Sequence, residues 1–158
     1  MSLVRSARGT WTGTMVGGEG SIEMMTGTGV SSFPMTWEAR SRRTDAVSTP
    51  EELIAAAQAT CYNMALAHQL TEGGTPPTHL ETTVDVAFST AAGITGITLH
   101  VLGEVPGLTP DQFQDVAEAA RRLCTVSRAL AGTTITLDAR LFLPASAAGP
   151  VLPPDPSA

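Results

Sequence analysis

The sequence contains no lysine, few charged residues of any kind and only two cysteines. Its nine cationic side chains other than histidine are all arginines, so chemistry that needs a lysine amine, such as Schiff-base formation, is excluded. Charged residues make up 15% of the chain, compared with about a quarter in an ordinary globular protein. This low charge indicates that part of the surface is buried in an oligomer interface. The net charge of -6 argues against a nucleic acid or an anionic membrane as a partner.

The chain also lacks long apolar segments and metal-binding patterns. The first residues, MSLVRSARGTW, include no apolar run of signal-peptide length. No stretch approaches the roughly 20 apolar residues of a membrane span. We therefore expect a cytoplasmic protein, in which two cysteines are reduced at rest and a disulfide between them is transient. No histidine spacing matches a zinc site, so we expect neither a metal nor another cofactor.

The residues that are present form an α+β pattern. Alternating apolar and polar segments predict two hairpins and a C-terminal strand, and two segments predict helices. The fold class is therefore α+β, with antiparallel sheets packed around two main helices. The strand-like segments are residues 10–16, 21–25, a short strand within 30–40 that contains PMTWEAR, 78–90, 94–104 and 132–143.

The first helix has a strong start signal. Thr49 is placed to cap it, Pro50 occupies the first helical position and Glu52 completes a capping box. Apolar residues then recur at helical spacing to about Thr71. Cys61 falls near the middle of this helix, on its apolar face.

The second helix begins in the same way and leads to the other cysteine. Thr109 is placed as its cap and Pro110 follows, and the apolar face of the helix includes Cys124. We expect one domain over residues 1–143. Residues 144–158 contain five prolines and are expected to form a tail without a core of its own.

The position of Cys61 leaves two interpretations open. Free cysteine is among the most buried residue types, so the thiol side chain is explained by packing alone. A reactive thiol instead needs a lowered pKa. Cys61 lies roughly 18 Å from the start of the helix, beyond the reach of the helix dipole, and burial among apolar neighbours raises a thiol pKa. A reactive Cys61 therefore needs a positive charge from elsewhere, which in this chain must be an arginine.

Arginines lie near both predicted helices. If the second helix continues past Cys124, Arg121 and Arg128 lie near the same face as that cysteine. Each of these arginines is equally consistent with an ordinary solvated surface charge. The two groups are Arg40, Arg42 and Arg43 before the first helix, and Arg121, Arg122 and Arg128 around Cys124.

Three segments resemble the OsmC/Ohr family of thiol peroxidases. The stretch TPEELIAAAQATCYNMALA, residues 49–67, is similar to the family's signature helix, with its cysteine ten positions after the first glutamate. The segment AARRLCTVSRAL resembles the second-cysteine segment of the family. PMTWEAR places an arginine shortly before the first helix, as in the OsmC branch. The resemblance covers roughly residues 9–143.

The resemblance implies an enzyme that reduces organic hydroperoxides, and hydrogen peroxide less well. It implies an intertwined homodimer with active sites at the subunit interface. It also implies that a Cys61–Cys124 disulfide is recycled by a small dithiol or a lipoyl-bearing protein. The catalytic residues that it implies are peroxidatic Cys61, resolving Cys124, Glu51 and an arginine, which is Arg40, with Arg42 and Arg43 as alternatives.

The implied role of Glu51 is restricted by helix geometry. Glu51 lies about 15 Å from Cys61 along one helix, so the carboxylate is not adjacent to the thiol unless the helix breaks. It can hold an arginine that spans the gap through a bidentate pair, or serve the site of the partner subunit. As a first-turn acid, Glu51 also has an ordinary role in stabilising the helix dipole.

Two positions depart from the family pattern. Thr125 follows the second cysteine, where proline is common, and Tyr62 follows the first, where phenylalanine is common. Because threonine keeps a backbone N–H that proline lacks, we expect the resolving segment to move differently. Tyr62 and Met64 are bulky neighbours of Cys61, and we expect them to favour alkyl peroxides.

Two other function classes remain open at this stage. One is a non-catalytic dimeric binding module for an apolar ligand, in which both cysteines only pack. The other is a cysteine hydrolase that uses His79 or His100, which requires a histidine in contact with Cys61. His68 does not serve, because it lies about 10 Å from Cys61 along the helix.

Overall fold

The computed structural model describes residues 3–26, 32–42 and 47–142, which form two three-stranded sheets and two long helices. The proline-rich segment 144–158 and Arg43 lie outside the described residues. The elements in chain order are β1 (Ala7–Thr12), β2 (Glu19–Met24), β3 (Ser32–Thr36), α1 (Trp37–Ser41), α2 (Pro50–Glu72), β4 (His79–Ser89), β5 (Gly93–Glu104), α3 (Pro110–Leu123), α4 (Thr125–Ala129) and β6 (Ile135–Leu141).

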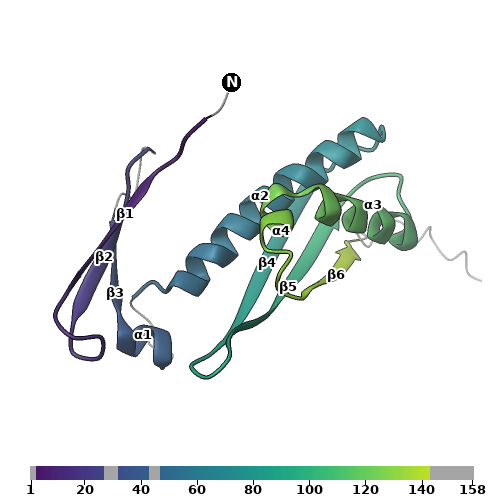
Figure 1. The fold of residues 1–158 in the computed structure, drawn as a ribbon. Helices are drawn as coiled ribbons and strands as arrows, with labels where there is room; N and C mark the ends of the chain where they lie inside the picture. Colours follow the sequence, from purple (N-terminus) through teal and green to yellow (C-terminus); the bar gives the residue numbers. More distant parts are fainter. Residues whose placement is uncertain (1–2, 27–31, 43–46, 143–158) are drawn as a thin grey trace, which may run out of the picture.

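The first three strands form an antiparallel sheet that lies beyond the N-terminal end of α2, apart from the rest of the chain (Figure 1). Every residue of β1 is exposed. The expected strand through PMTWEAR is wrong in its second half, because Trp37–Ser41 is helical. Thr36 explains the change, since its hydroxyl accepts a hydrogen bond from the Ala39 N–H and caps the helix α1.

Helix α2 confirms the start that the sequence predicts. The Thr49 hydroxyl accepts a hydrogen bond from the Glu52 N–H, while the Glu52 carboxylate accepts one from the Thr49 N–H. Helix α3 repeats this capping box with Thr109 and Gln112. Within the described residues, no helix is long and apolar enough to cross a membrane.

The last three strands form the sheet that α2 and α3 cover, and one of its pairings corrects the sequence prediction. Strands β4 and β5 form the expected antiparallel hairpin, but β6 pairs with β5 in parallel. The chain leaves β5, runs through α3 and α4 and then enters β6 (Figure 1). A helical crossover of this length returns the chain to the end of the sheet where β5 began, so the next strand runs in the same direction.

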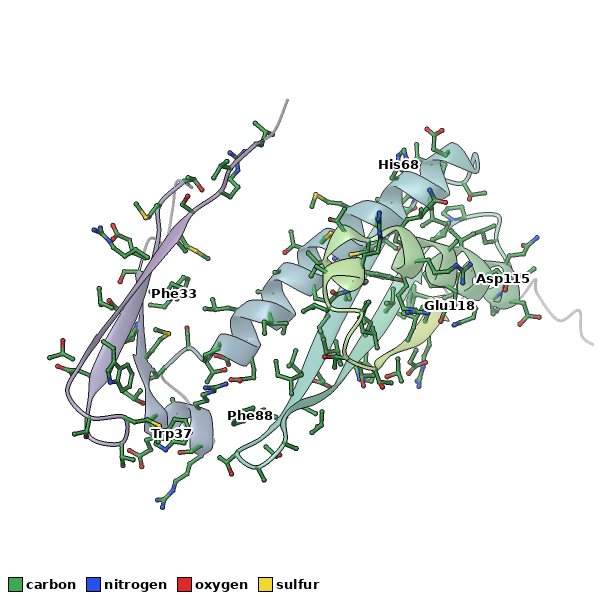
Figure 2. All side chains as sticks on the ribbon, viewed as in Figure 1. Phe33, Trp37, His68, Phe88, Asp115 and Glu118 are labelled. Carbon is green, nitrogen blue, oxygen red and sulfur yellow. The ribbon has the colours of Figure 1, made fainter. Side chains whose placement is uncertain are left out.

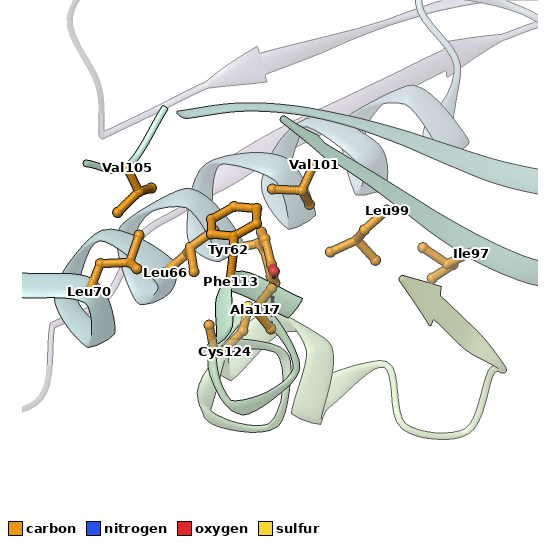
Figure 3. Close-up of a cluster of buried hydrophobic side chains, with 11 residues drawn as sticks. Tyr62, Leu66, Leu70, Ile97, Leu99, Val101, Val105, Phe113, Ala117 and Cys124 are labelled. Carbon is orange, nitrogen blue, oxygen red and sulfur yellow. Dashed lines mark hydrogen bonds between the residues drawn. The ribbon is translucent and has the colours of Figure 1, made fainter. Parts of the chain in front are cut away.

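The core lies between α2, α3 and β5 (Figure 3). Tyr62 and Leu66 of α2 pack with Phe113 of α3, and all three side chains are fully buried. The Phe113 ring lies so close to Gly103 that a Cβ at this position would clash with it. Cys124 belongs to the same cluster, so the core determines where the second cysteine lies.

Candidate active site

Cys61 and Cys124 lie side by side, although 63 positions separate them in the sequence. Both thiols are free, and their sulfurs are 3.2 Å apart, compared with about 2 Å in a disulfide. Cys61 lies within α2, whereas Cys124 lies at the junction of α3 and α4, where it ends the first helix and caps the second. A small movement of this junction is therefore enough to join the two sulfurs.

The surroundings of Cys61 favour its thiolate. Partial burial raises the pKa of the Cys61 thiol, but hydrogen bonds from the segment after α3 outweigh that effect, so the pKa lies below its ordinary value. The largest of the lowering contributions is the Thr125 hydroxyl, whose Oγ1 is 3.3 Å from the Cys61 Sγ. The Val126 backbone, the Cys124 thiol and the Thr125 backbone contribute the remainder. Within the single chain, hydrogen bonds and not a nearby charge thus lower the pKa of the Cys61 thiol.

Cys124 is enclosed by a small buried polar group. Its side chain is 1% exposed, and the Ser127 N–H donates to its sulfur over 3.5 Å. The Gln58 amide donates to the Ser127 hydroxyl over 2.6 Å, and both residues are buried. Within the described residues the Gln58 Oε1 has no hydrogen-bond partner. The hydrogen bond between Gln58 and Ser127 joins α4 to α2 next to the two sulfurs.

Two of the arginines around Cys124, Arg121 and Arg122, pair with Glu118, and the third is exposed. Because α3 ends at Leu123, the helix does not continue past Cys124 and the expected shared face does not form. Arg121 donates to the Glu118 carboxylate over 2.9 Å, and Arg128 lies exposed on α4. Their charges therefore do not contribute to the lowered pKa of Cys61.

A second polar group lies at the N-terminal end of α2. Both Nε and one terminal nitrogen of Arg40 donate to the Oε1 of Glu51, over 3.1 and 2.9 Å. The guanidinium also lies over the Phe88 ring, 4.5 Å from its centre. Phe88 lies at the end of β4 that faces α1 (Figure 2), where the pairing register with β5 shifts and leaves Thr95 as the bulged residue. Glu51 and Phe88 thus hold the planar head of Arg40 in one orientation.

The two polar groups are separate within one chain. Helix α2 is continuous from Pro50 to Glu72, so Glu51 remains about 15 Å from Cys61 along the axis. No hydrogen bond joins Arg40 to Cys61 in the part of the chain that the structure describes. Of the three arginines before α2, Arg40 is the one paired with Glu51, Arg42 is exposed, and Arg43 lies outside the described residues.

An open groove of about 490 Å³ runs beside Arg40. Its walls are largely aromatic and thioether side chains from the N-terminal sheet and α1. Such a lining accepts an apolar group, while the guanidinium at its edge binds oxygen atoms. The lining residues include Trp11, Met15, Met35, Trp37, Arg40 and Pro50.

The histidines lie away from the thiols. His100 pairs with Asp85 over 3.2 Å and lies 3.8 Å from Asp138, on the exposed face of the second sheet. His68 lies near the C-terminal end of α2 (Figure 2). Among the described residues, no group of three possible ligands is arranged to hold a metal ion. The side chains that contact the Cys61 sulfur among the described residues are those of Thr125 and Cys124, so the hydrolase hypothesis lacks the histidine contact that it requires.

Sequence reasoning missed or misjudged three residues of the site. Thr125 was noted for its backbone, but its hydroxyl is the atom that contacts Cys61. Phe88 gives no signal in the sequence, because its contact with Arg40 joins two segments that are far apart in the chain. Tyr62 does not face a substrate, since it is fully buried and its hydroxyl donates to the Ala117 carbonyl. Met64, in contrast, is 64% exposed.

Known proteins are similar to this chain in fold and sequence. Peroxiredoxin OsmC of Escherichia coli strain K12 is 34% identical over 144 residues, which cover 89% of this chain and 99% of that protein. The organic hydroperoxide resistance protein OhrB of Bacillus subtilis is 25% identical in its crystal structure, with a TM-score of 0.57 and coverage of 87% and 98%. An OsmC-like protein from Mycoplasma pneumoniae has a TM-score of 0.69 at 14% identity, with coverage of 90% and 100%.

A family model described as OsmC-like protein matches residues 44–138. This range includes α2, the second sheet up to β6 and both cysteines. Together with the similarity to Peroxiredoxin OsmC along nearly the whole chain, the match establishes that this chain belongs to the OsmC-like family.

Proposed function

We propose that this protein reduces organic hydroperoxides, and hydrogen peroxide less well, through its paired cysteines. Family membership and the similarity to Peroxiredoxin OsmC make it a thiol peroxidase. The single observation that carries the mechanism is the separation of 3.2 Å between the sulfurs of Cys61 and Cys124. Cys61 is the peroxidatic residue, because its pKa is lowered and its side chain is less buried than that of Cys124.

The first step is nucleophilic attack of the Cys61 thiolate on the terminal (hydroxyl) oxygen of the hydroperoxide. A sulfur–oxygen bond forms, the oxygen–oxygen bond breaks, and the leaving alkoxide takes a proton to become an alcohol. The sulfur loses two electrons in becoming a sulfenic acid, and the peroxide gains them.

Cys124 then resolves the intermediate. Its thiol condenses with the sulfenic acid to form the Cys61–Cys124 disulfide, and water leaves. An external dithiol, either a small molecule or a lipoyl group on a protein, reduces this disulfide by two exchange steps and becomes a disulfide itself. A cytoplasmic location fits the cycle, because it begins from two free thiols.

Arg40 and Glu51 act on the peroxide in this proposal. The guanidinium donates to the peroxide oxygens and stabilises the negative charge that develops on the leaving oxygen, while Glu51 fixes its orientation. Because both lie about 15 Å from the thiol of their own chain, we assign them to the active site that contains Cys61 of the partner subunit.

A homodimer formed through α2 fits the composition of that helix. Residues 53–71 contain no charged residue, yet Ala56, Thr60 and Met64 along one face are exposed in the single chain. The N-terminal sheet also exposes Trp11 by 43% and Met15 by 60%. Apolar surfaces of this kind are typical of subunit interfaces, and a three-stranded sheet needs a packed face to be stable. A second copy of the chain would cover both the exposed face of α2 and the N-terminal sheet.

An organic substrate fits the apolar groove beside Arg40. Its walls suit the hydrocarbon part of an alkyl or aryl hydroperoxide, which hydrogen peroxide lacks. The exposed side chain of Met64, one turn after Cys61, offers a further apolar contact. A non-catalytic binding module would also use the groove, but it gives no reason for a lowered thiol pKa beside a second thiol.

Steady-state turnover tests the proposal. The reduced protein is mixed with excess cumene hydroperoxide and dihydrolipoamide, and loss of peroxide is followed. We expect consumption of many equivalents per subunit, slower consumption of hydrogen peroxide, and none with Cys61→Ser. If the wild-type protein consumes no more peroxide than Cys61→Ser, the proposed function is wrong and the binding module is favoured.

A further inference from the structure

Thr125 is the residue that contacts the Cys61 sulfur from the segment carrying the second cysteine. Its Oγ1 lies 3.3 Å from the Sγ of Cys61, and the Sγ of Cys124 lies 3.2 Å from the same atom. Two consecutive residues thus converge on one sulfur. We propose that Thr125 is a catalytic residue whose hydroxyl donates a hydrogen bond to the Cys61 thiolate, an inference that rests on the proposed function.

The direction of this hydrogen bond follows from the chemistry of the two groups. A thiolate carries no proton, so it accepts and the hydroxyl must donate. A hydrogen bond to an ionised acceptor is stronger than one between neutral groups, so the contact stabilises the thiolate more than the thiol. Thr125 keeps its proton throughout the reaction, and the leaving alkoxide takes its proton from solvent water.

The backbone at Cys124 makes the convergence possible. Successive residues of a continuous helix point about 100° apart, so they do not approach the same atom. Cys124 has φ -58° and ψ 121°, outside the helical region, and this conformation ends α3 and starts α4. The break turns both the thiol of Cys124 and the hydroxyl of Thr125 toward α2.

Within a single chain, the nearby arginines are paired with other residues, so Thr125 is the group that stabilises the Cys61 thiolate. The Arg40 guanidinium is engaged with Glu51 and Phe88, and Arg121 with Glu118. Among the influences that oppose burial at Cys61, the Thr125 hydroxyl is the largest. The Thr125 hydroxyl therefore lowers the pKa of Cys61 within the single chain, without a group from a second subunit.

The placement also links activation to resolution. The hydroxyl that stabilises the thiolate and the thiol that attacks the sulfenic acid lie on adjacent residues of one turn. Gln58 and Ser127 fasten that turn to α2. A protein in which this turn moves away from α2 loses both functions together, so Cys61 is activated only where Cys124 is in place to resolve it.

The experiment compares Thr125→Val, which removes the hydroxyl but keeps the branched shape, with Thr125→Ser, which retains the hydroxyl. In the full-length reduced protein, the rate of Cys61 alkylation by iodoacetamide is measured against pH, with the modified peptide identified by mass spectrometry. The single-turnover rate of oxidation by cumene hydroperoxide is measured in parallel. Thermal unfolding confirms that each variant is folded.

For Thr125→Val we expect alkylation and oxidation about three- to tenfold slower on the acidic side of the profile, because fewer Cys61 side chains are ionised. At high pH the variant should exceed the wild type, because a thiolate that lacks a hydrogen bond is the better nucleophile. The two profiles should therefore cross, and Thr125→Ser should follow the wild type.

Two results would overturn the inference: an alkylation profile unchanged in Thr125→Val, or a reduction by the same factor at every pH, which indicates a structural role. Alkylation requires no peroxidase activity. Crossing alkylation profiles in a protein that consumes no peroxide would therefore retain the hydrogen bond but overturn the proposed function and the catalytic role with it.

Discussion

Helix α2 carries two polar groups that are built in different ways. The thiol pair in its middle lies against the core, with Cys124 buried and Cys61 partly exposed. At its start, Glu51 pairs with Arg40 of α1, which lines an open groove beside a sheet with an exposed first strand. The thiol pair is complete within one subunit, whereas the arginine is oriented but has no thiol to act on. In the proposed mechanism, redox chemistry therefore belongs to the single chain and peroxide activation to a dimer.

Removing the resolving thiol should have the largest effect on turnover. In Cys124→Ser, Cys61 still reacts with the first peroxide, but no internal disulfide forms and excess peroxide converts Cys61 to sulfinic and sulfonic acids. We expect turnover with dihydrolipoamide to fall to background after a brief initial phase. Intact-mass spectrometry measures the added oxygen atoms. Sustained turnover at the wild-type rate would show that Cys124 does not resolve the intermediate.

Arg40→Met should slow the first oxidation of Cys61 on the order of a hundredfold, because it removes the charged donor from the developing oxyanion. Alkylation of Cys61 should change much less in the same variant. Arg42→Met is the matched control, since Arg42 is exposed and not paired with Glu51. A normal oxidation rate in Arg40→Met would remove this residue from the site.

Mixed dimers distinguish an arginine that acts within its own chain from one that acts on the partner. After Arg40→Met and Cys61→Ser subunits are exchanged, a heterodimer has one site with both an intact arginine and an intact thiol, provided that Arg40 serves the partner subunit. Random mixing should then restore about a quarter of wild-type activity. No gain over the separate variants would assign Arg40 to its own chain.

Loss of the ring beneath the arginine should have a smaller effect. Phe88→Leu keeps an apolar residue at this position but removes the aromatic face, so we expect oxidation of Cys61 to slow about two- to tenfold. Phe88→Tyr keeps the face and should restore the rate. Single-turnover kinetics provide the measurement, and equal rates for Leu and Tyr would mean that the ring does not orient Arg40.

The smallest expected effect concerns the support of the thiol pair. Tyr62→Phe removes a buried hydroxyl that donates to the Ala117 carbonyl over 3.0 Å, and should lower the free energy of unfolding by about 1 kcal/mol. Thr71→Val removes an exposed hydroxyl that bonds within α2 and should change it by less than about 0.5 kcal/mol. Denaturant unfolding measures both. Equal losses would mean that Tyr62 does not brace α2 against α3.

The sequence predicted features that depend on local signals. The capping box at Thr49 and the Thr-Pro start at Thr109 predict the starts of α2 and α3, since each uses residues within one turn. The parallel pairing of β6 was not predicted, because strand direction depends on the crossover and not on alternation. Trp37 was assigned to a strand because the capping role of Thr36 was not recognised.

In the candidate site, too, local features could be predicted from the sequence and long-range contacts could not. The position of Cys61 on α2 followed from periodicity, and its pairing with Cys124 followed from the resemblance. The contacts of Arg40 with Phe88 and of Cys61 with Thr125 join segments far apart in the sequence. The first contact joins segments that no local pattern pairs, the second depends on a helix break, and neither has a clear signature in one sequence. Physical reasoning therefore required a cation near Cys61, whereas a hydroxyl is the group found there.

The most direct test adds one equivalent of cumene hydroperoxide to the reduced protein and maps its disulfides by mass spectrometry. The mechanism predicts loss of both thiols, one molecule of alcohol per subunit and a linkage between the peptides that contain Cys61 and Cys124. Thiols that survive excess peroxide unchanged, or a linkage only between different subunits, would contradict it.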